Sequence, residues 1–372
     1  MPILATQPIK AVYALLAVVY ELTRFPIWVL LYTFRVGRPH KSWTFSQALR
    51  MRIVKSFLAH SSTVRTKTKL SLEPGVEGDR FTIINPQGNW AYKGPLADTS
   101  IRPTKIGAVW TPSALQRSQV DDADVVLHFH GGAYVIGAAR DADLGFTTRT
   151  FVKHSRITHV LAPAYRLSSN AGGRFPAALQ DAVSAYMHLT DKLRVPPSRI
   201  TISGDSAGGN LALALLRYIH DHGKALGLPW PGCVWLWSPW VNVHAALDIT
   251  SISSSPQYST DYLGPTFGHW GASTFSEGCD PMDPYLTPLG NAFESKSPIF
   301  VQTGRAEVLY DDNVQIAEEF RAKGASVQLV VKEGAPHDII LVAPVIDFVR
   351  VAQEAAKEAG EFLRENRLTA KL

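Results

Sequence analysis

One serine, Ser206, lies in a setting suited to nucleophilic chemistry. It occurs in Gly204-Asp205-Ser206-Ala207-Gly208, between the β-branched run RITISG and the helix-like run LALALLRYIH. G-x-S-x-G between a strand and a helix is typical of a sharp turn that displays a nucleophilic hydroxyl. Small neighbours permit such a turn, and the amides at the start of the next helix favour a developing anion. A glycine-rich turn with a capping serine is the simpler alternative, but the combined pattern favours Ser206 as a nucleophile.

A nucleophilic serine needs a base, and the base needs an orienting carboxylate. Only two histidines follow residue 260: His269, in a region rich in Ser, Gly and aromatic residues, and His337, in the loop EGAPHDII after the last expected strand. We therefore predict His337 as the base. The loop TGRAEVLYDDN offers Glu307, Asp311 and Asp312 as the acid. Asp311 and Asp312 suit a helix start, so Glu307, which follows its strand sooner, is the predicted acid and Asp311 the runner-up.

The segment HFHGGAYVIG supplies a candidate oxyanion hole. His130-Gly131-Gly132-Ala133 follows an expected strand directly, and its small residues allow backbone amides to approach a ligand closely. A Gly-Gly pair alone often only makes a turn. Upstream of a G-x-S-x-G sequence, however, it indicates that Gly131, Gly132 and Ala133 stabilise an oxyanion.

Alternating strand and helix patterns surround these residues from about residue 100 onward. This alternation predicts an α/β fold with a mostly parallel central sheet flanked by helices. Residues 80–86 and 105–112 are expected to form antiparallel strands that lead into it. The other expected strands are 125–130, 157–165, 199–204, 233–238, 298–304 and 326–334, and the expected helices are 176–193, 206–222, 311–323 and 341–358.

Residues 240–297 interrupt this alternation. They are rich in Ser, Pro, Gly and aromatic side chains and are too long for a plain connection between strands. Long insertions of this kind are usually functional, which predicts a lid at about residues 241–297. We expect a catalytic domain over residues 71–372 and a separate apolar, basic segment over residues 1–70.

The N-terminal segment combines apolar runs with positive charge. Residues 1–70 contain eleven Lys or Arg but one acid, Glu21, while the 372-residue chain has a net charge of +5. The apolar runs 11–20 and 25–34 are separated by charged residues, and a central Arg24 costs about 2.5–3.5 kcal/mol in a spanning helix. Two alternatives remain open: a membrane contact with the basic residues on the cytosolic side, or a soluble cap helix over the active site. A secretory signal is not expected, because no small-residue cleavage site follows the first apolar run. No nucleic-acid-binding module is evident.

The chain resembles the hormone-sensitive-lipase-like branch of the α/β-hydrolases over about residues 120–345. The resemblance implies Ser206 as nucleophile, His337 as base, Glu307 at the position of the family's acid, and Gly132, Ala133 and Ala207 as oxyanion donors. Ala133 replaces the family's usual third glycine, Glu307 its usual Asp, and the usual acidic residue after YRL is missing. These departures, together with the apolar and basic N-terminal segment, resemble features of fungal members of the family. Those members include secondary-metabolite hydrolases and steryl-acetate deacetylases. The matching segments are HFHGGAYVIG, APAYRL with FPAALQDA, ISGDSAGGNLALAL, WSPW, PIFVQTGRAEVLYDD and APHD.

The expected activity is hydrolysis of a small apolar carboxylic ester by a serine hydrolase of the carboxylesterase or deacetylase kind, with no cofactor and no metal. An acyltransferase, or an enzyme that releases or cyclises a biosynthetic intermediate, would use the same triad. A binding protein on this scaffold, such as the plant gibberellin receptors, is a further alternative, disfavoured because all three triad residues are present. Two cysteines, Cys233 and Cys279, are too few for a disulfide framework and favour an intracellular location.

Overall fold

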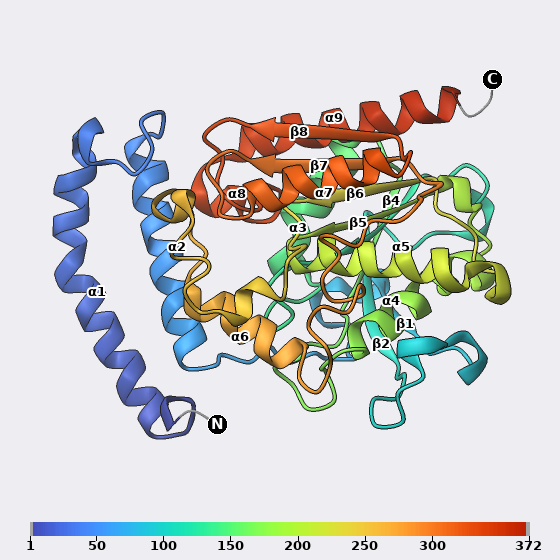
Figure 1. The fold of residues 1–372 in the computed structure, drawn as a ribbon, viewed down its shortest axis with the longest axis horizontal. Coiled ribbons are helices and arrows are strands. Elements are labelled where there is room, and N and C mark those ends of the chain that lie inside the picture. Colours follow the sequence, from blue (N-terminus) through green and yellow to red (C-terminus); the bar gives the residue numbers. More distant parts are fainter. Residues whose placement is uncertain (1–2, 370–372) are drawn as a thin grey trace.

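An eight-stranded sheet forms the centre of the molecule (Figure 1). The computed structural model describes residues 3–369. The strand order is β1-β2-β4-β3-β5-β6-β7-β8, in which β1 and β2 are antiparallel to their neighbours and the remaining strands are parallel. The strands are β1 (Phe81–Ile84), β2 (Ile106–Thr111), β3 (Val125–Phe129), β4 (His159–Pro163), β5 (Ile200–Asp205), β6 (Cys233–Trp237), β7 (Ile299–Gly304) and β8 (Val327–Lys332).

Every expected strand is present, and the antiparallel placement of the first two is confirmed. The expected helix over 341–358 is wrong, because the chain breaks at Asp347, whose φ of 65° is left-handed, and forms two helices. Helix α3 was not predicted. The helices are α1 (Ile9–Thr33), α2 (Phe45–Thr63), α3 (Asp141–Thr150), α4 (Ala177–Met187), α5 (Ala207–Leu226), α6 (Pro265–Phe275), α7 (Tyr310–Ala322), α8 (Ile339–Ile346) and α9 (Val349–Thr369).

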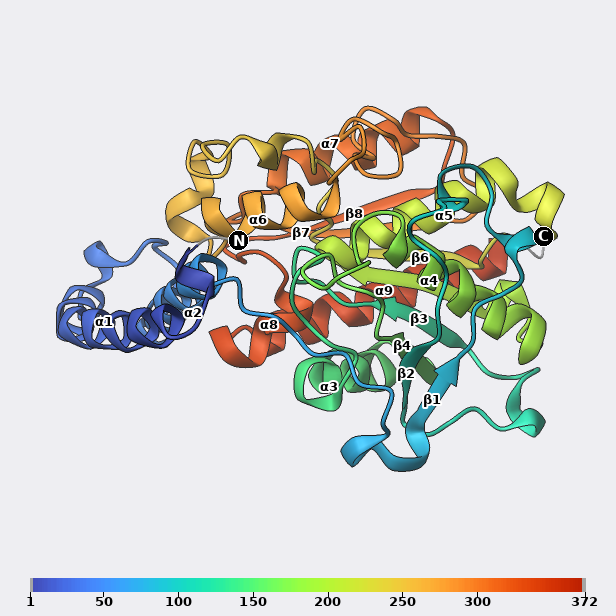
Figure 2. The ribbon, with the colours of Figure 1, turned by 90° about the horizontal axis from the view of Figure 1, so that it is seen from below.

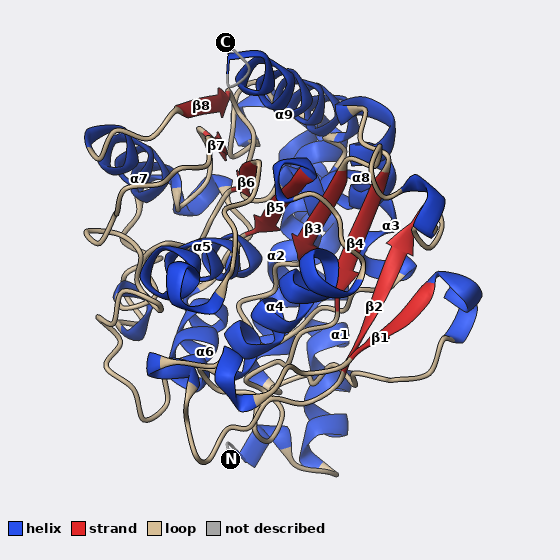
Figure 3. Cartoon of the chain, turned by 90° about the vertical axis from the view of Figure 1, so that its right-hand side faces the viewer, coloured by secondary structure: helices blue, strands red, loops and turns tan. Residues whose placement is uncertain are grey.

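Helices cover both faces of the sheet (Figure 3). Helices α4, α5 and α7 lie on one face, and α3, α8 and α9 lie on the other. This explains why β3, β5 and β6 are buried along their whole length and why β3 and β6 carry nearly continuous apolar runs. The loops after β3, β5, β7 and β8 all leave the carboxyl edge of the parallel strands, where ligands bind in open α/β sheets.

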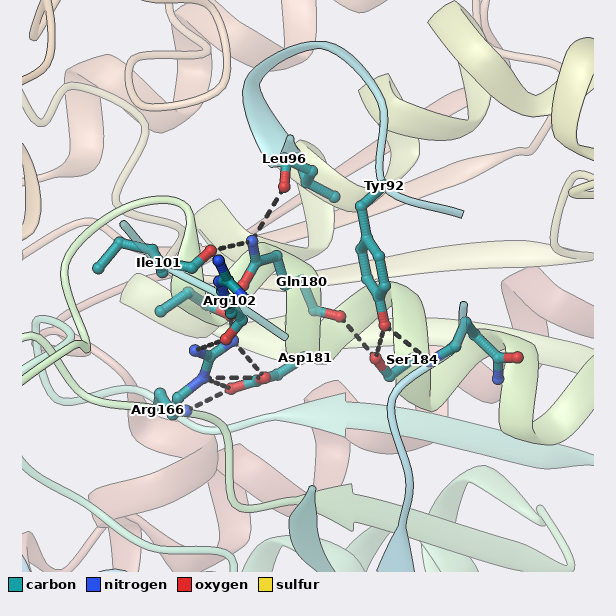
Figure 4. Close-up of polar contacts among 10 residues, drawn as sticks. Tyr92, Leu96, Ile101, Arg102, Arg166, Gln180, Asp181 and Ser184 are labelled. Atoms are coloured by element: carbon teal, nitrogen blue, oxygen red, sulfur yellow. Dashed lines mark hydrogen bonds and ion pairs between the residues drawn. The ribbon is translucent and has the colours of Figure 1, made fainter. Parts of the chain in front are cut away.

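An ion pair joins the segment after β4 to helix α4, and hydrogen bonds from the same region hold the segment before β2 (Figure 4). Nη2 of Arg166 donates to Oδ1 of Asp181 at 2.8 Å, and Nη1 donates to the carbonyl of Arg102. Gln180 adds hydrogen bonds to the carbonyls of Leu96 and Ile101. The segments APAYRL and FPAALQDA therefore have a structural role: they hold residues 96–102 against the core.

Helices α1 and α2 form a hairpin at one end of the molecule, apart from the sheet (Figures 1 and 2). A capping box between Thr44 and Gln47 begins α2, and α2 packs on α6 and α8. Helix α1 packs mainly on α2. Only 6% of its most apolar stretch is buried, and within the described part of the chain it is the one helix long and apolar enough to cross a membrane.

Candidate active site

Ser206 occupies the sharp turn between β5 and α5. Its φ of 49° is left-handed, which places its side chain outside the line of both elements. The neighbours must be glycine, because a Cβ on Gly204 would lie 2.0 Å from the carbonyl oxygen of Gly208, and one on Gly208 would lie 1.9 Å from that of Phe129. The spacing of the G-x-S-x-G sequence is thus a steric requirement of this turn.

The expected acid and base lie together. Oε2 of Glu307, in the loop after β7, is 3.1 Å from Nδ1 of His337, in the loop after β8. The other carboxylate oxygen, Oε1, accepts hydrogen bonds from Thr303, from the Gly304 amide and from Asn313. Both partners are buried. The structure thus brings Glu307 to the histidine, whereas the runner-up Asp311 lies at the start of α7.

Charge around His337 sets its protonation. Burial by itself would lower the pKa of His337, but the hydrogen bond and charge of Glu307, with a smaller contribution from Asp261, raise this pKa above its ordinary value. Asp261 is a fully buried carboxyl that accepts hydrogen bonds from the amides of Val308 and Leu263. It ties residues 261–263 to the loop of the acid, and sequence reasoning did not identify it.

The loop after β3 borders both cavities that Ser206 lines, through Gly132 and Ala133. Among residues 3–369, no carbonyl or side chain accepts a hydrogen bond from the amides of Gly132, Ala133 or Ala207. Gly131 is different: its amide donates to Oδ2 of Asp205 at 2.6 Å. The prediction of Gly131 as an oxyanion donor is therefore wrong, because its N–H is already engaged.

A cluster of buried polar side chains joins this loop to the nucleophile and the base. Nε2 of His128 lies 3.0 Å from Oδ1 of Asp205, and the carboxyl of Asp338 lies against Asp205. Burial acts to raise the pKa of Asp205, but contact with His128 holds it below its ordinary value. Burial and the adjacent Asp205 carboxylate raise the pKa of Asp338 well above its ordinary range. These opposite pKa shifts favour the protonated form of Asp338 as donor and the ionised form of Asp205 as acceptor.

Sequence reasoning missed this cluster, although Asp205 and Asp338 directly precede Ser206 and follow His337. A carboxyl next to each of two catalytic candidates was the available signal. The contact between Asp205 and Asp338 connects the turn of Ser206 to the loop of His337. The backbone amide of Asp338 also donates a hydrogen bond to the hydroxyl of Ser238.

Two further contacts fix the shape of the loop after β3. Tyr134 donates to Oδ1 of Asn210 on α5 at 2.7 Å, and its ring stacks on Phe275 at the end of α6. A Cβ on Gly271 of α6 would lie 2.6 Å from the carbonyl oxygen of Ala133. Helix α6, within the segment expected to form a lid, thus packs directly on the candidate oxyanion loop.

Ser206 lies between two cavities. One, of about 260 Å³, is also lined by Ala133 and Trp240 and extends to Asp311 and Asp312. Burial raises the pKa of Asp312 to about 6. The second cavity, of about 240 Å³, is lined by Gly132, His337 and apolar side chains of α2 and α8. A substrate bound at Ser206 can therefore extend in two directions.

Helix α2, not α1, covers the site. Val54, Phe57 and Leu58 of α2 line the second cavity, whereas no described residue of α1 lines either cavity. The alternative in which residues 11–34 form a cap over the active site is therefore wrong. The covering helix follows them in the sequence and has a more polar composition.

This arrangement contains the parts needed for acyl transfer: a displayed hydroxyl, an imidazole oriented by a carboxylate, and free amides beside them. Within residues 3–369, no three His, Cys, Asp or Glu side chains are grouped as metal ligands. The absence of a cofactor stays a prediction.

Comparison with known proteins gives consistent results. A family model described as alpha/beta hydrolase fold matches residues 126–341. An acetyl-hydrolase of Streptomyces hygroscopicus is 30% identical over 258 residues, which is 69% of this chain and 79% of that protein. An ethyl acetate hydrolase of Pseudomonas putida is 27% identical, over 63% of this chain and 73% of its own.

A solved structure agrees with these relatives. The crystal structure of an esterase from the bacterial hormone-sensitive lipase family superposes with a TM-score of 0.58 at 25% identity. The match covers 92% of this chain and 98% of that one.

Proposed function

Because the chain belongs to the alpha/beta hydrolase family, we propose that it hydrolyses its substrate through an acyl-enzyme on Ser206. The protein is a carboxylic ester hydrolase, as its relatives are. The identities of the catalytic residues are our proposal. The observation that carries it is the 3.1 Å contact between Glu307 and His337, at a cavity that His337 shares with Ser206.

The proposed mechanism has two halves. Ser206 attacks the ester carbonyl while Nε2 of His337 removes its proton, and Glu307 stabilises the imidazolium that forms. The amides of Gly132, Ala133 and Ala207 bind the oxyanion. His337 then protonates the departing alcohol, and water activated by the same imidazole releases the acid. Loss of one oxyanion donor in such sites typically lowers the rate by about 10²–10³.

We propose a short acyl group, acetyl above all, joined to a largely apolar alcohol. Support comes from the names of the relatives, an acetyl-hydrolase and an ethyl acetate hydrolase, and from the modest cavities of about 260 and 240 Å³ beside Ser206. The apolar lining supplied by α2 and α8 favours an apolar portion there.

Labelling and substrate profiling test both parts. A fluorophosphonate probe should label the protein but not the Ser206→Ala variant, and labelling that persists in the variant would contradict the acyl-enzyme assignment. Across p-nitrophenyl esters from acetate to palmitate, kcat/KM should be highest for the shortest acyl groups. A maximum at palmitate would contradict the short-acyl proposal.

We also propose that residues 1–70 contact a membrane from the cytosolic side through α1, while α2 of the same segment packs on the catalytic domain. The exposed apolar surface of α1 and the basic excess of this segment support this contact. The similarity to fungal enzymes of secondary metabolism stays a prediction, since the relatives described above are bacterial.

A further inference from the structure

The two charged residues in the middle of α1, Glu21 and Arg24, are paired, and Glu21 faces α2. Glu21 lies 3.3 Å from Nε2 of His60 and 3.9 Å from Nη2 of Arg52, both on α2. Arg24 pairs with Glu21 at 3.5 Å, and Tyr13 hydrogen-bonds Nδ1 of His60. The charges that interrupt the apolar sequence are thus satisfied inside the hairpin, at its inner face.

The outer face of α1 is mostly apolar over its middle, where Thr23 is an exposed polar residue. Its members are more than half exposed in most cases: Leu15 66%, Leu16 62%, Val19 50%, Ile27 59% and Leu30 67%. Phe34 and Val36 extend this surface beyond the helix, exposed by 61% and 95%. Contiguous exposed apolar surface of this kind marks an interaction site.

Basic residues lie near both ends of α1, and Lys10 also lines the groove between α1 and α2. Lys10 lies at the start of α1, and Arg35 and Lys41 follow its end as exposed side chains. An apolar helix face bordered by cations matches an anionic lipid surface, where the helix lies in the interface with its apolar side among the acyl chains. Lying there leaves the inner charges paired with α2, away from the hydrocarbon.

The groove between α1 and α2 approaches the catalytic cavity. This groove, of about 530 Å³, is lined by Val18, Phe25, Ile53 and Phe57 among others. Phe57 also lines the apolar cavity of Ser206, together with Val345 of α8. Both side chains are exposed, by 63% and 57%. The groove between α1 and α2 and the mouth of the active site therefore share the exposed apolar side chain of Phe57.

From this continuity we propose that the substrate is an ester dissolved in the membrane, which enters between Phe57 and Val345 while the outer face of α1 rests on the bilayer. The inference rests on the proposed function at Ser206 and names its substrate class: short-chain esters of lipophilic alcohols. The ester would pass from the hydrocarbon into the cavity of about 240 Å³ without crossing bulk water.

Two acetates separate delivery from chemistry. Hexadecyl acetate is supplied in phosphatidylcholine vesicles that contain phosphatidylserine, and p-nitrophenyl acetate is supplied in water. The test variant is L15Q/V19Q/L30Q, because Gln preserves helix propensity. The matched control is V76Q/M282Q/L368Q, which removes three apolar side chains exposed by 93%, 50% and 67% elsewhere on the surface.

The test variant should lose co-flotation with vesicles and hydrolyse hexadecyl acetate about tenfold more slowly or worse, with p-nitrophenyl acetate turnover unchanged. The control variant should match the unmodified enzyme in all three measurements. Hexadecyl acetate turnover that is equal in test variant and unmodified enzyme, or equally reduced in the control, would overturn the inference while leaving the mechanism intact.

A second variant examines the mouth itself. Phe57→Asp places a charge where the ester enters, so the ratio of hexadecyl acetate to p-nitrophenyl acetate turnover should fall about tenfold. An unchanged ratio would overturn the entry route. If the unmodified enzyme hydrolyses neither acetate and Ser206 resists the fluorophosphonate, the mechanism fails and the inference fails with it.

Discussion

The amide of Gly131 donates a 2.6 Å hydrogen bond to Oδ2 of Asp205, so the residue before the nucleophile holds the loop that faces it. The same carboxylate lies beside Asp338, which follows the base. Asp205 and Asp338 are thus positioning residues that act through the groups next to them. Their roles differ, because the lowered pKa of Asp205 favours an anion that accepts from the loop, whereas the raised pKa of Asp338 favours its protonated form.

Asp205→Asn should lower kcat by about 10–100-fold with little change in KM, because the Gly131 amide loses its anionic acceptor and the oxyanion loop shifts. Asp338→Asn should stay within about threefold of the unmodified enzyme, because an amide can replace a protonated carboxyl as donor. Steady-state kinetics with p-nitrophenyl acetate measures both. An equal loss in the two variants would contradict the assigned protonation states.

Glu307→Gln should lower kcat by about 10⁴-fold, as loss of the orienting acid does in other triads. The residual activity should also change its pH profile. Glu307 raises the pKa of His337, and the reaction needs the neutral imidazole, so activity falls as pH drops through this pKa. Without the carboxylate the pKa of His337 is lower, and the acidic limb should move to lower pH.

The matched variant is Asp311→Asn, the other candidate acid. Asp311 lines the first cavity without contacting His337, so this change should alter KM more than kcat and leave the acidic limb in place. If Asp311→Asn abolished turnover while Glu307→Gln did not, the assignment of the acid would be wrong.

Gly271→Ala should lower kcat about tenfold or more, because the new methyl would lie 2.6 Å from the carbonyl oxygen of Ala133 and displace an oxyanion donor. Gly264→Ala, at the N-cap of the same helix, is the control, since nothing lies within 4 Å of its Cβ position. Burst kinetics with p-nitrophenyl acetate would locate the defect in acylation. Full activity of Gly271→Ala would show that α6 does not determine the position of this loop.

Arg166→Ala should destabilise the fold by about 3–5 kcal/mol, because it leaves the buried Asp181 without its cation. Arg166→Ala combined with Asp181→Asn should recover part of this loss. Arg305→Ala breaks an exposed pair with Glu333 and should cost less than about 1 kcal/mol. Urea unfolding measures all three, and a small effect of Arg166→Ala would mean that water or another group solvates Asp181.

The sequence was sufficient for the strands and for most of the site because both depend on local rules. The β-branched runs that became β3 and β5 favour strands, and the glycines around Ser206 are required by one turn. Glu307 could be preferred over Asp311 because position after a strand end is a local property.

Contacts between distant segments could not be predicted in this way. The hydrogen bond from the Gly131 amide to Asp205 depends on the spacing of β3 and β5 in the folded sheet. The contact between Asp205 and Asp338 depends on the path of the loop after β8. The sequence near Asp347 contains no glycine and no charge pattern that would predict the end of α8 there. The charges of α1 disfavour a membrane contact when the sequence of that helix is considered alone. In the folded protein, Arg52 and His60 of α2 pair with Glu21.

The position of Ser206 between two cavities also bears on the order of events in turnover. If the acyl group occupies one cavity and the alcohol the other, the first product can depart while its partner stays covalently bound. The cavity that the first product leaves can then admit the second nucleophile. If water enters that cavity first, the acyl-enzyme is hydrolysed, and if another alcohol enters first, the acyl group is transferred to it. The widths of the openings of the two cavities, rather than the triad, would therefore separate an esterase from an acyltransferase.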